Sequence, residues 1–173
     1  MKTCYTSSQI IDLAPYYDCS IMIHKLKENS CGESRLSFED DSEMKLVSCS
    51  EQVIYVNETN AIITEIEIIG YSCYCGYQDW VDIVDCQGER VSYNFYLNNM
   101  SDDEENCNEN QSYMCKKIAT FDFYDDEIII KNKYIYSCKL SCHRQGPIKE
   151  IRLPYNPNIY IIKIIMRFDD DNE

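Results

Sequence analysis

Basic side chains are scarce in this sequence. Its 173 residues include 16 Lys and Arg against 30 Asp and Glu, which gives a formal net charge of −14. Such an excess of negative charge repels phosphate backbones and anionic lipid headgroups. Because the sequence has no local cluster of basic residues to offset it, we expect neither nucleic acid nor membrane among the partners.

Long apolar runs are also missing. No stretch approaches the roughly 18 residues that span a bilayer, so we predict no transmembrane segment. Residues 1–30 contain no apolar core of a signal peptide followed by small residues. We therefore expect a mature chain from which a signal has been removed, with Met1 as an added start residue.

Motifs for catalysis and cofactor binding are absent as well. With only 5 glycines, the sequence has no glycine-rich phosphate loop and no Gly-x-Ser-x-Gly element. Its two histidines, His24 and His143, are far apart, and adjacent Cys142 and His143 would point to opposite faces of a strand. Zinc knuckles are only approximated, by residues 73–75 and 138–142. We expect no enzyme, no cofactor and no metal site.

What the sequence does contain is apolar residues at every second position, the spacing of β-strands. In residues 61–75, isoleucines fall on one face and Glu65 and Glu67 on the other, which is typical of a strand buried on one face only. No segment shows convincing helical spacing. The same alternation marks residues 20–27, 43–49, 91–97, 118–124, 128–130, 134–140, 148–153 and 158–168.

About ten short strands joined by polar turns predict one domain, residues 1–173, folded as an all-β, two-layer antiparallel β-sandwich with a single core. Two connections, residues 32–42 and 98–111, are long and acidic. Charged loops of this kind are usually solvated spacers. Long loops on a rigid sheet are also where binding sites occur.

Cysteine is abundant, with 11 in the chain. Since disulfides persist in oxidising compartments, this number predicts several disulfides and a secreted protein. An odd number leaves at least one cysteine unpaired or linked to another chain, and the spacing does not fix the pairing. Cys73 and Cys75 would lie on one strand face about 7 Å apart, beyond disulfide reach, and so take different partners.

Three Asn-x-Ser/Thr sequons begin at Asn57, Asn99 and Asn110. Together with the cysteines they favour secretion. We predict that these asparagines lie on exposed loops or edges and carry glycans when the protein is secreted from eukaryotic cells.

The segment from Tyr16 to Cys31, an alternating strand followed by a polar turn and a cysteine, resembles the beginning of the poxvirus immune-evasion domain. The resemblance covers mainly residues 16–49, and the rest of the chain agrees in its general acidic, cysteine-rich, all-β character. That family includes secreted chemokine-binding proteins, other cytokine decoys, and proteins that hold class I histocompatibility molecules or block costimulation. The resemblance implies a viral β-sandwich that captures a host immune protein.

Charge narrows the choice of ligand. Chemokines are strongly basic, and acidic loops would steer them toward the protein. Interfaces also favour aromatic residues as anchors. We therefore predict that a chemokine or another basic cytokine binds at Glu39, Asp40, Asp41, Tyr74, Tyr77, Trp80, Tyr96, Asp102, Asp103, Glu104 and Glu105.

Two alternatives remain open. The protein could bind a host cell-surface immune receptor or a class I histocompatibility molecule, although the final residues do not form an endoplasmic-reticulum retrieval signal. It could also be a cysteine-rich adhesive surface domain of a parasite with an AT-rich genome, since Ile, Asn, Lys and Tyr are heavily used.

Overall fold

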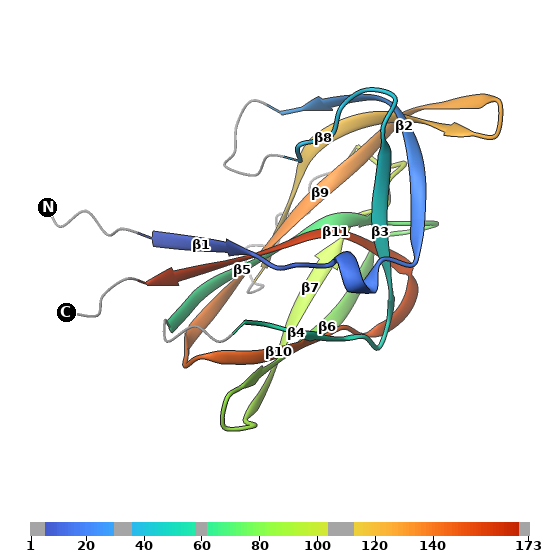
Figure 1. Cartoon of the computed structure of the whole chain (residues 1–173). Coiled ribbons are helices and arrows are strands. Elements are labelled where there is room, and N and C mark those ends of the chain that lie inside the picture. The colour runs from blue at the N-terminus through green and yellow to red at the C-terminus, as the bar shows by residue number, and fades with distance from the viewer. Residues whose placement is uncertain (1–5, 30–35, 58–61, 104–112, 170–173) are drawn as a thin grey trace, which may run out of the picture.

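The computed structural model describes residues 6–29, 36–57, 62–103 and 113–169, which form eleven strands and one short 3-10 helix (Figure 1). The prediction of an all-β chain is confirmed. No helix among these residues is both long enough and apolar enough to cross a bilayer. The elements are β1 (Thr6–Ile10), η1 (Ala14–Tyr16), β2 (Cys19–Glu28), β3 (Glu43–Ser50), β4 (Val53–Tyr55), β5 (Ile62–Ser72), β6 (Tyr77–Asp85), β7 (Arg90–Leu97), β8 (Tyr113–Asp125), β9 (Ile128–Gln145), β10 (Ile148–Arg152) and β11 (Tyr155–Asp169).

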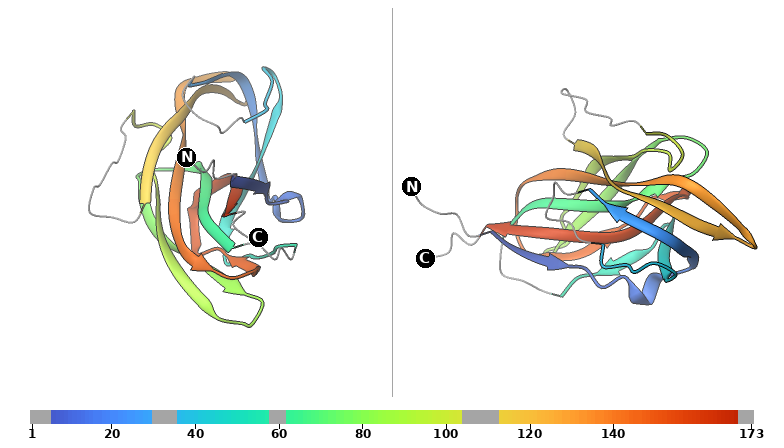
Figure 2. Two further views of the ribbon diagram at one scale, coloured as in Figure 1. Left: turned by 90° about the vertical axis from the view of Figure 1, so that its left-hand side faces the viewer. Right: turned by 90° about the horizontal axis from the view of Figure 1, so that it is seen from above.

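The larger of the two sheets closes on itself. Seven strands follow the order β1-β11-β3-β2-β8-β9-β5, and β11 also pairs with β5. Six strands therefore form a closed antiparallel barrel, while β1 pairs only with the last part of β11, from Ile165 onward. The prediction of a simple two-layer sandwich is wrong for this sheet, because β11 is long enough to pair on both of its edges (Figure 2).

The smaller sheet has the order β4-β10-β6-β7. It packs against the outer surface of the barrel, and its residues Val81, Ile83 and Phe95 share one core with outward-facing residues of β5, β9 and β11. A second core fills the barrel, where Ile23, Met44 and Phe121 belong to a separate buried cluster. The protein thus has two cores in place of the one predicted.

A bulge in β11 changes the face to which its side chains point. Ile161 lies opposite Gly70 and Lys163 opposite Ile69, so Ile162 is an extra residue. Before and after it, Ile161 and Ile164 both face the smaller sheet, which simple alternation does not predict. Gly70 is required at this point, because an added Cβ would lie 2.0 Å from the carbonyl oxygen of Tyr160.

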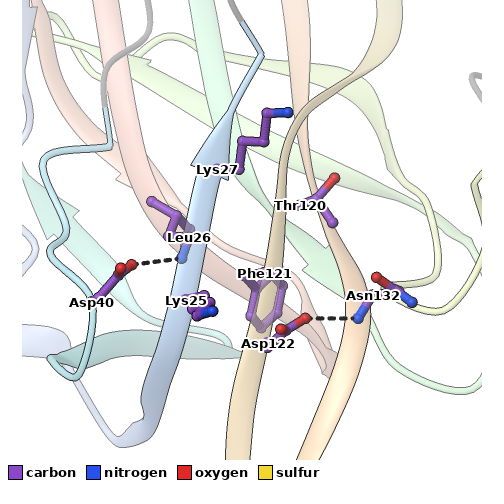
Figure 3. A pocket seen from close by; sticks show the side chains of 8 residues that line it. All are labelled: Lys25, Leu26, Lys27, Asp40, Thr120, Phe121, Asp122 and Asn132. Carbon is purple, nitrogen blue, oxygen red and sulfur yellow. Dashed lines mark hydrogen bonds between the residues drawn. The ribbon is translucent and has the colours of Figure 1, made fainter.

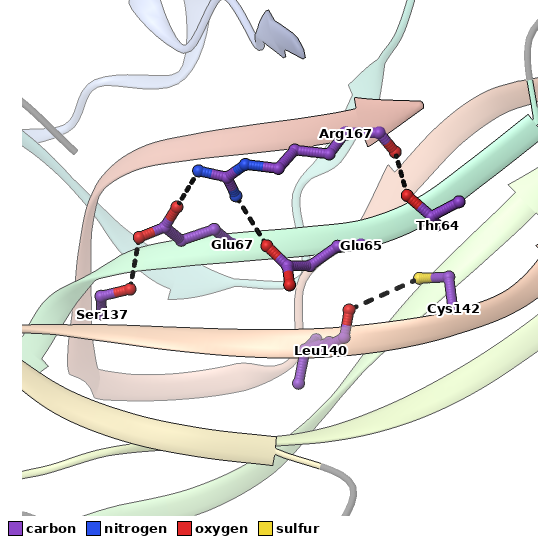
Figure 4. A network of polar contacts seen from close by, with 7 residues as sticks. All are labelled: Thr64, Glu65, Glu67, Ser137, Leu140, Cys142 and Arg167. Carbon is purple, nitrogen blue, oxygen red and sulfur yellow. Dashed lines mark hydrogen bonds and ion pairs between the residues drawn. The ribbon is translucent and has the colours of Figure 1, made fainter. Parts of the chain in front are cut away.

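A polar network joins β5, β9 and β11 (Figure 4). Arg167 donates to Glu65 Oε1 at 2.8 Å and to Glu67 Oε2 at 2.7 Å, and the Ser137 hydroxyl donates to the other oxygen of Glu67. Glu67 is 1% exposed and lies on the same face of β5 as Ile69, inside the barrel. The prediction that this face of the strand is open is therefore wrong, because barrel closure covers it.

No disulfide joins the cysteines in the described part of the chain. Cys49, Cys115, Cys138 and Cys142 are buried, where they pack as small apolar side chains. The described part of the structure thus contains none of the predicted disulfides, and its cysteines are thiols. Three further cysteines lie outside the described residues: Cys4, Cys31 and Cys107.

The prediction that Cys73 and Cys75 lie on one face of a strand is also wrong. Strand β5 ends at Ser72, and Tyr74 between the two cysteines has a positive φ of 75°. The pair therefore lies in a turn and not on one strand face. Cys73 is half-buried against the barrel core, whereas Cys75 is exposed.

Candidate binding surface

The two predicted acidic loops lie in different places. Asp41 contacts Tyr124 near the end of β8, whereas Asp103 pairs with Lys117 near its beginning. Lys117 and Tyr124 are seven residues apart, or roughly 23 Å along a strand. The loops therefore do not form one site, and Glu104 and Glu105 lie outside the described residues.

The predicted aromatic anchors divide into two groups. Trp80, on β6 of the smaller sheet, is 53% exposed, and Tyr74 in the turn before β6 is 86% exposed. Tyr77 and Tyr96 pack against the core between the sheets. Asn158 donates to the Tyr77 hydroxyl at 3.0 Å, so this tyrosine supports the fold. Only Trp80 and Tyr74 have the exposure that an anchor needs.

The predicted glycosylation sites also differ from one another. Asn57 is exposed, as predicted. Asn99 is only 9% exposed, and its side-chain oxygen accepts a hydrogen bond from the Ser101 amide at 3.1 Å. The prediction of an exposed side chain is therefore wrong for Asn99, because a bridge to Ser72 holds this segment against the barrel. Asn110 lies outside the described residues.

The hairpin of β8 and β9 extends beyond the neighbouring strands (Figure 1). Exposed apolar side chains lie near its tip. Met22, Tyr124 and Ile129 lie side by side across β2, β8 and β9. Directly opposed residues of antiparallel strands share a face, so these three side chains form one row. Met22 is 44% exposed and Ile129 is 37% exposed. Ile128 at the hairpin tip is 66% exposed, but it pairs with Asp125 in the register and points to the opposite face of the hairpin. We call Met22, Tyr124 and Ile129 the hairpin patch.

Exposed carboxylates border the hairpin patch on several sides. Glu43 lies opposite Met22, Asp41 contacts Tyr124, and residues 125–127 connect Tyr124 to Ile128. Patches of this composition, apolar in the middle and charged at the rim, are typical of protein interfaces. The exposed acidic residues of these segments are Glu39, Asp40, Asp41, Glu43, Asp125, Asp126 and Glu127.

Sequence reasoning assigned the first of these acidic segments to the binding surface and left residues 125–127 only as the gap between two predicted strands. The signal was present: three acidic residues stand between an aromatic-rich run and Ile128, and this is the pattern of a hairpin turn. Asp126 takes the positive φ, 53°, that such a turn needs.

Hydrogen bonds hold the 39–42 loop against β2 and β8. The Tyr124 hydroxyl donates to Asp41 Oδ1 at 3.1 Å and lies 2.7 Å from His24 Nδ1. Desolvation and this bond to Asp41 raise the pKa of Tyr124. Asp40 Oδ1 accepts from the Leu26 amide at 3.1 Å. The loop is therefore held against the sheet, and these bonds fix the positions of the Asp40 and Asp41 carboxylates.

An open pocket of about 470 Å³ lies next to this loop (Figure 3). The backbone amide of Asn132 donates to Asp122 Oδ1 at 3.0 Å, and both residues line the pocket. The pocket is lined by lysines as well as by carboxylates. It therefore suits a polar segment of a partner better than an apolar ligand. Its lining residues are Lys25, Leu26, Lys27, Asp40, Thr120, Phe121, Asp122 and Asn132.

No protein-family model matches this chain. A search of curated proteins found no significant match either. The resemblance to the poxvirus immune-evasion domain therefore stays a hypothesis. Among the described residues, no group of three His, Cys, Asp or Glu side chains is arranged to hold a metal ion.

Proposed function

We propose that this protein is a secreted viral decoy that binds a basic host immune mediator, in the first place a chemokine, and that it acts without catalysis. The observation that carries the proposal is the hairpin patch. It combines the exposed apolar side chains of Met22 and Ile129 with a border of seven exposed carboxylates. A basic partner gains both apolar burial and charge complementarity at such a surface.

The net charge of −14 also favours a basic partner. A strongly negative protein raises the association rate of a positive ligand by long-range steering, and salt weakens this effect. Apolar contacts then determine how long the complex lasts. We therefore assign steering to the acidic border and retention to Met22 and Ile129.

Secretion and a viral source are supported by sequence features and not by the hairpin patch. Asn57 is an exposed sequon, and this supports passage through a secretory pathway. The described cysteines add no disulfide to that argument. The viral source rests on the resemblance of residues 16–49 alone.

The first experiment is a binding screen by surface plasmon resonance. The immobilised protein is presented with a panel of chemokines, growth-factor cytokines, cell-surface immune receptors and class I molecules. We expect at least one chemokine to bind at micromolar concentration or better. If no chemokine binds but a receptor or a class I molecule does, the chemokine assignment is wrong.

The second experiment locates the surface. Ile129→Ser removes an apolar side chain from the hairpin patch and should shorten the lifetime of the complex roughly tenfold, in line with a moderate hot spot. Trp80→Ala removes an exposed aromatic from the other sheet and serves as the control, which we expect to leave the lifetime unchanged. A loss of binding in Trp80→Ala alone would move the site to the smaller sheet.

A further inference from the structure

Two cysteines face each other across neighbouring strands. Cys115 on β8 lies directly opposite Cys138 on β9 in the antiparallel register. Opposed residues of antiparallel strands have Cα atoms about 4.5 or 5.5 Å apart, depending on the hydrogen-bonding pattern. Both separations fall within the range of about 4.4–6.8 Å that a disulfide spans. Among the described cysteines, no other two are in direct register.

The environment of the pair makes it unreactive once the protein is folded. Both side chains are fully buried in the core between the barrel and the smaller sheet. Desolvation, and to a lesser degree the nearby Cys115, raise the pKa of Cys138 to about 12. Thiol–disulfide exchange needs a thiolate that can reach the oxidant, and burial denies both conditions.

We propose that Cys115 and Cys138 form a cross-strand disulfide while the chain folds in the presence of a small-molecule disulfide such as oxidised glutathione. A thiolate of one cysteine attacks a sulfur of oxidised glutathione and releases one glutathione thiolate, which takes up a proton. The second cysteine then attacks the mixed disulfide and releases the other glutathione. The two cysteines lose two electrons and two protons, and oxidised glutathione becomes two molecules of reduced glutathione.

Folding itself brings the two thiols together. Residues 115 and 138 belong to one hairpin, so their approach needs only the pairing of β8 with β9. During this stage the smaller sheet need not yet cover them, and the oxidant has access. A chain that folds before oxidation retains both thiols, because the finished core protects them.

Peptide mapping tests this directly. The reduced, unfolded protein is refolded in a glutathione redox buffer, digested with trypsin without reduction and examined by mass spectrometry. Cleavage after Lys133 and Lys139 releases peptide 134–139 with Cys138 as its only cysteine. Cleavage after Arg90 and Lys116 releases peptide 91–116, which contains both Cys107 and Cys115. The Cys107→Ser variant therefore serves as the test protein.

We expect refolded Cys107→Ser to give peptides 91–116 and 134–139 joined, with a mass two hydrogen atoms below their sum. Cys107→Ser/Cys115→Ala should lose this species. Native reduced protein kept in the same buffer should form it at least roughly tenfold more slowly than refolding protein. Absence of the joined peptides from refolded Cys107→Ser, or their equally fast formation in the native protein, would overturn the proposal.

Discussion

Replacement of Arg167 by methionine tests how the barrel tolerates charge in its interior. Arg167 bonds two carboxylates, and Glu67 is 1% exposed while the Glu65 side chain is 30% exposed. Glu65 therefore retains contact with water after the substitution. Glu67 loses its cation, while the Ser137 hydroxyl still donates to it.

Removal of one member of a buried ion pair costs about 3–5 kcal/mol, because the remaining charge has no compensation. With a urea m-value of about 2 kcal/mol/M, which is usual for a small protein, the midpoint of unfolding should fall by roughly 1.5–2.5 M. Urea titration followed by tryptophan fluorescence measures this, since Trp80 is the single tryptophan.

Two further variants make the test specific. Glu67→Met/Arg167→Met removes both buried charges and should recover much of the lost stability, because an apolar pair of similar volume is tolerated in a core. Arg90→Met removes a 56% exposed arginine from its pair with Asp82 and should cost less than about 1 kcal/mol. The reasoning fails if Arg167→Met is no more destabilising than Arg90→Met.

Three other outcomes follow from the fold. Gly70→Ala should destabilise the protein by about 1–3 kcal/mol in the same titration, because its Cβ would meet a backbone oxygen of β11 at 2.0 Å; an unchanged midpoint would contradict this. Tyr124→Phe should cost about 1 kcal/mol and increase amide exchange at Asp41, since the loop loses a side-chain hydrogen bond; unaltered exchange would show that the bond is unimportant. Among the described cysteines, a thiol reagent should modify Cys75 and Cys86 first in the native protein, and rapid modification of the buried ones would refute the two-core packing.

Much of the strand content could be predicted from alternation alone. The segments at residues 20–27 and 43–49 match β2 and β3 because each buries one face against the barrel core. Three strands gave no usable signal: β1 is polar, β4 has three residues, and β6 interrupts its apolar positions with acidic residues.

Closure of the barrel could not be predicted from local pattern. It depends on the pairing of β11 with both β3 and β5. The bulge at Ile162 allows residues of this strand to pack in both cores. The position of Glu67 shows the consequence. Glu67 alternates with the isoleucines of β5, which is the pattern of a residue that faces solvent. Only the long-range pairing that closes the barrel buries this face of the strand.

The candidate site was predicted in part. Asp40 and Asp41 were identified as acidic loop residues, and they do border the hairpin patch. The tip at residues 125–127 was read only as the gap between two strands, since the sequence does not reveal that the hairpin extends beyond its neighbours. Trp80 was predicted as part of the same site, but it lies on the other sheet.

The most direct test of the proposed function is the association rate of a chemokine identified by the binding screen, compared between two charge-matched variants. Asp125→Asn/Asp126→Asn removes two charges beside the hairpin patch, and Asp102→Asn/Asp103→Asn removes two charges from the other acidic loop. At low ionic strength we expect the hairpin variant to associate roughly three- to tenfold more slowly than the wild type and the control to be nearly unaffected. The difference should shrink at physiological salt, where charges beyond about 8 Å are screened. Equal rates in the two variants, or a slower rate in the control alone, would contradict binding at the hairpin patch.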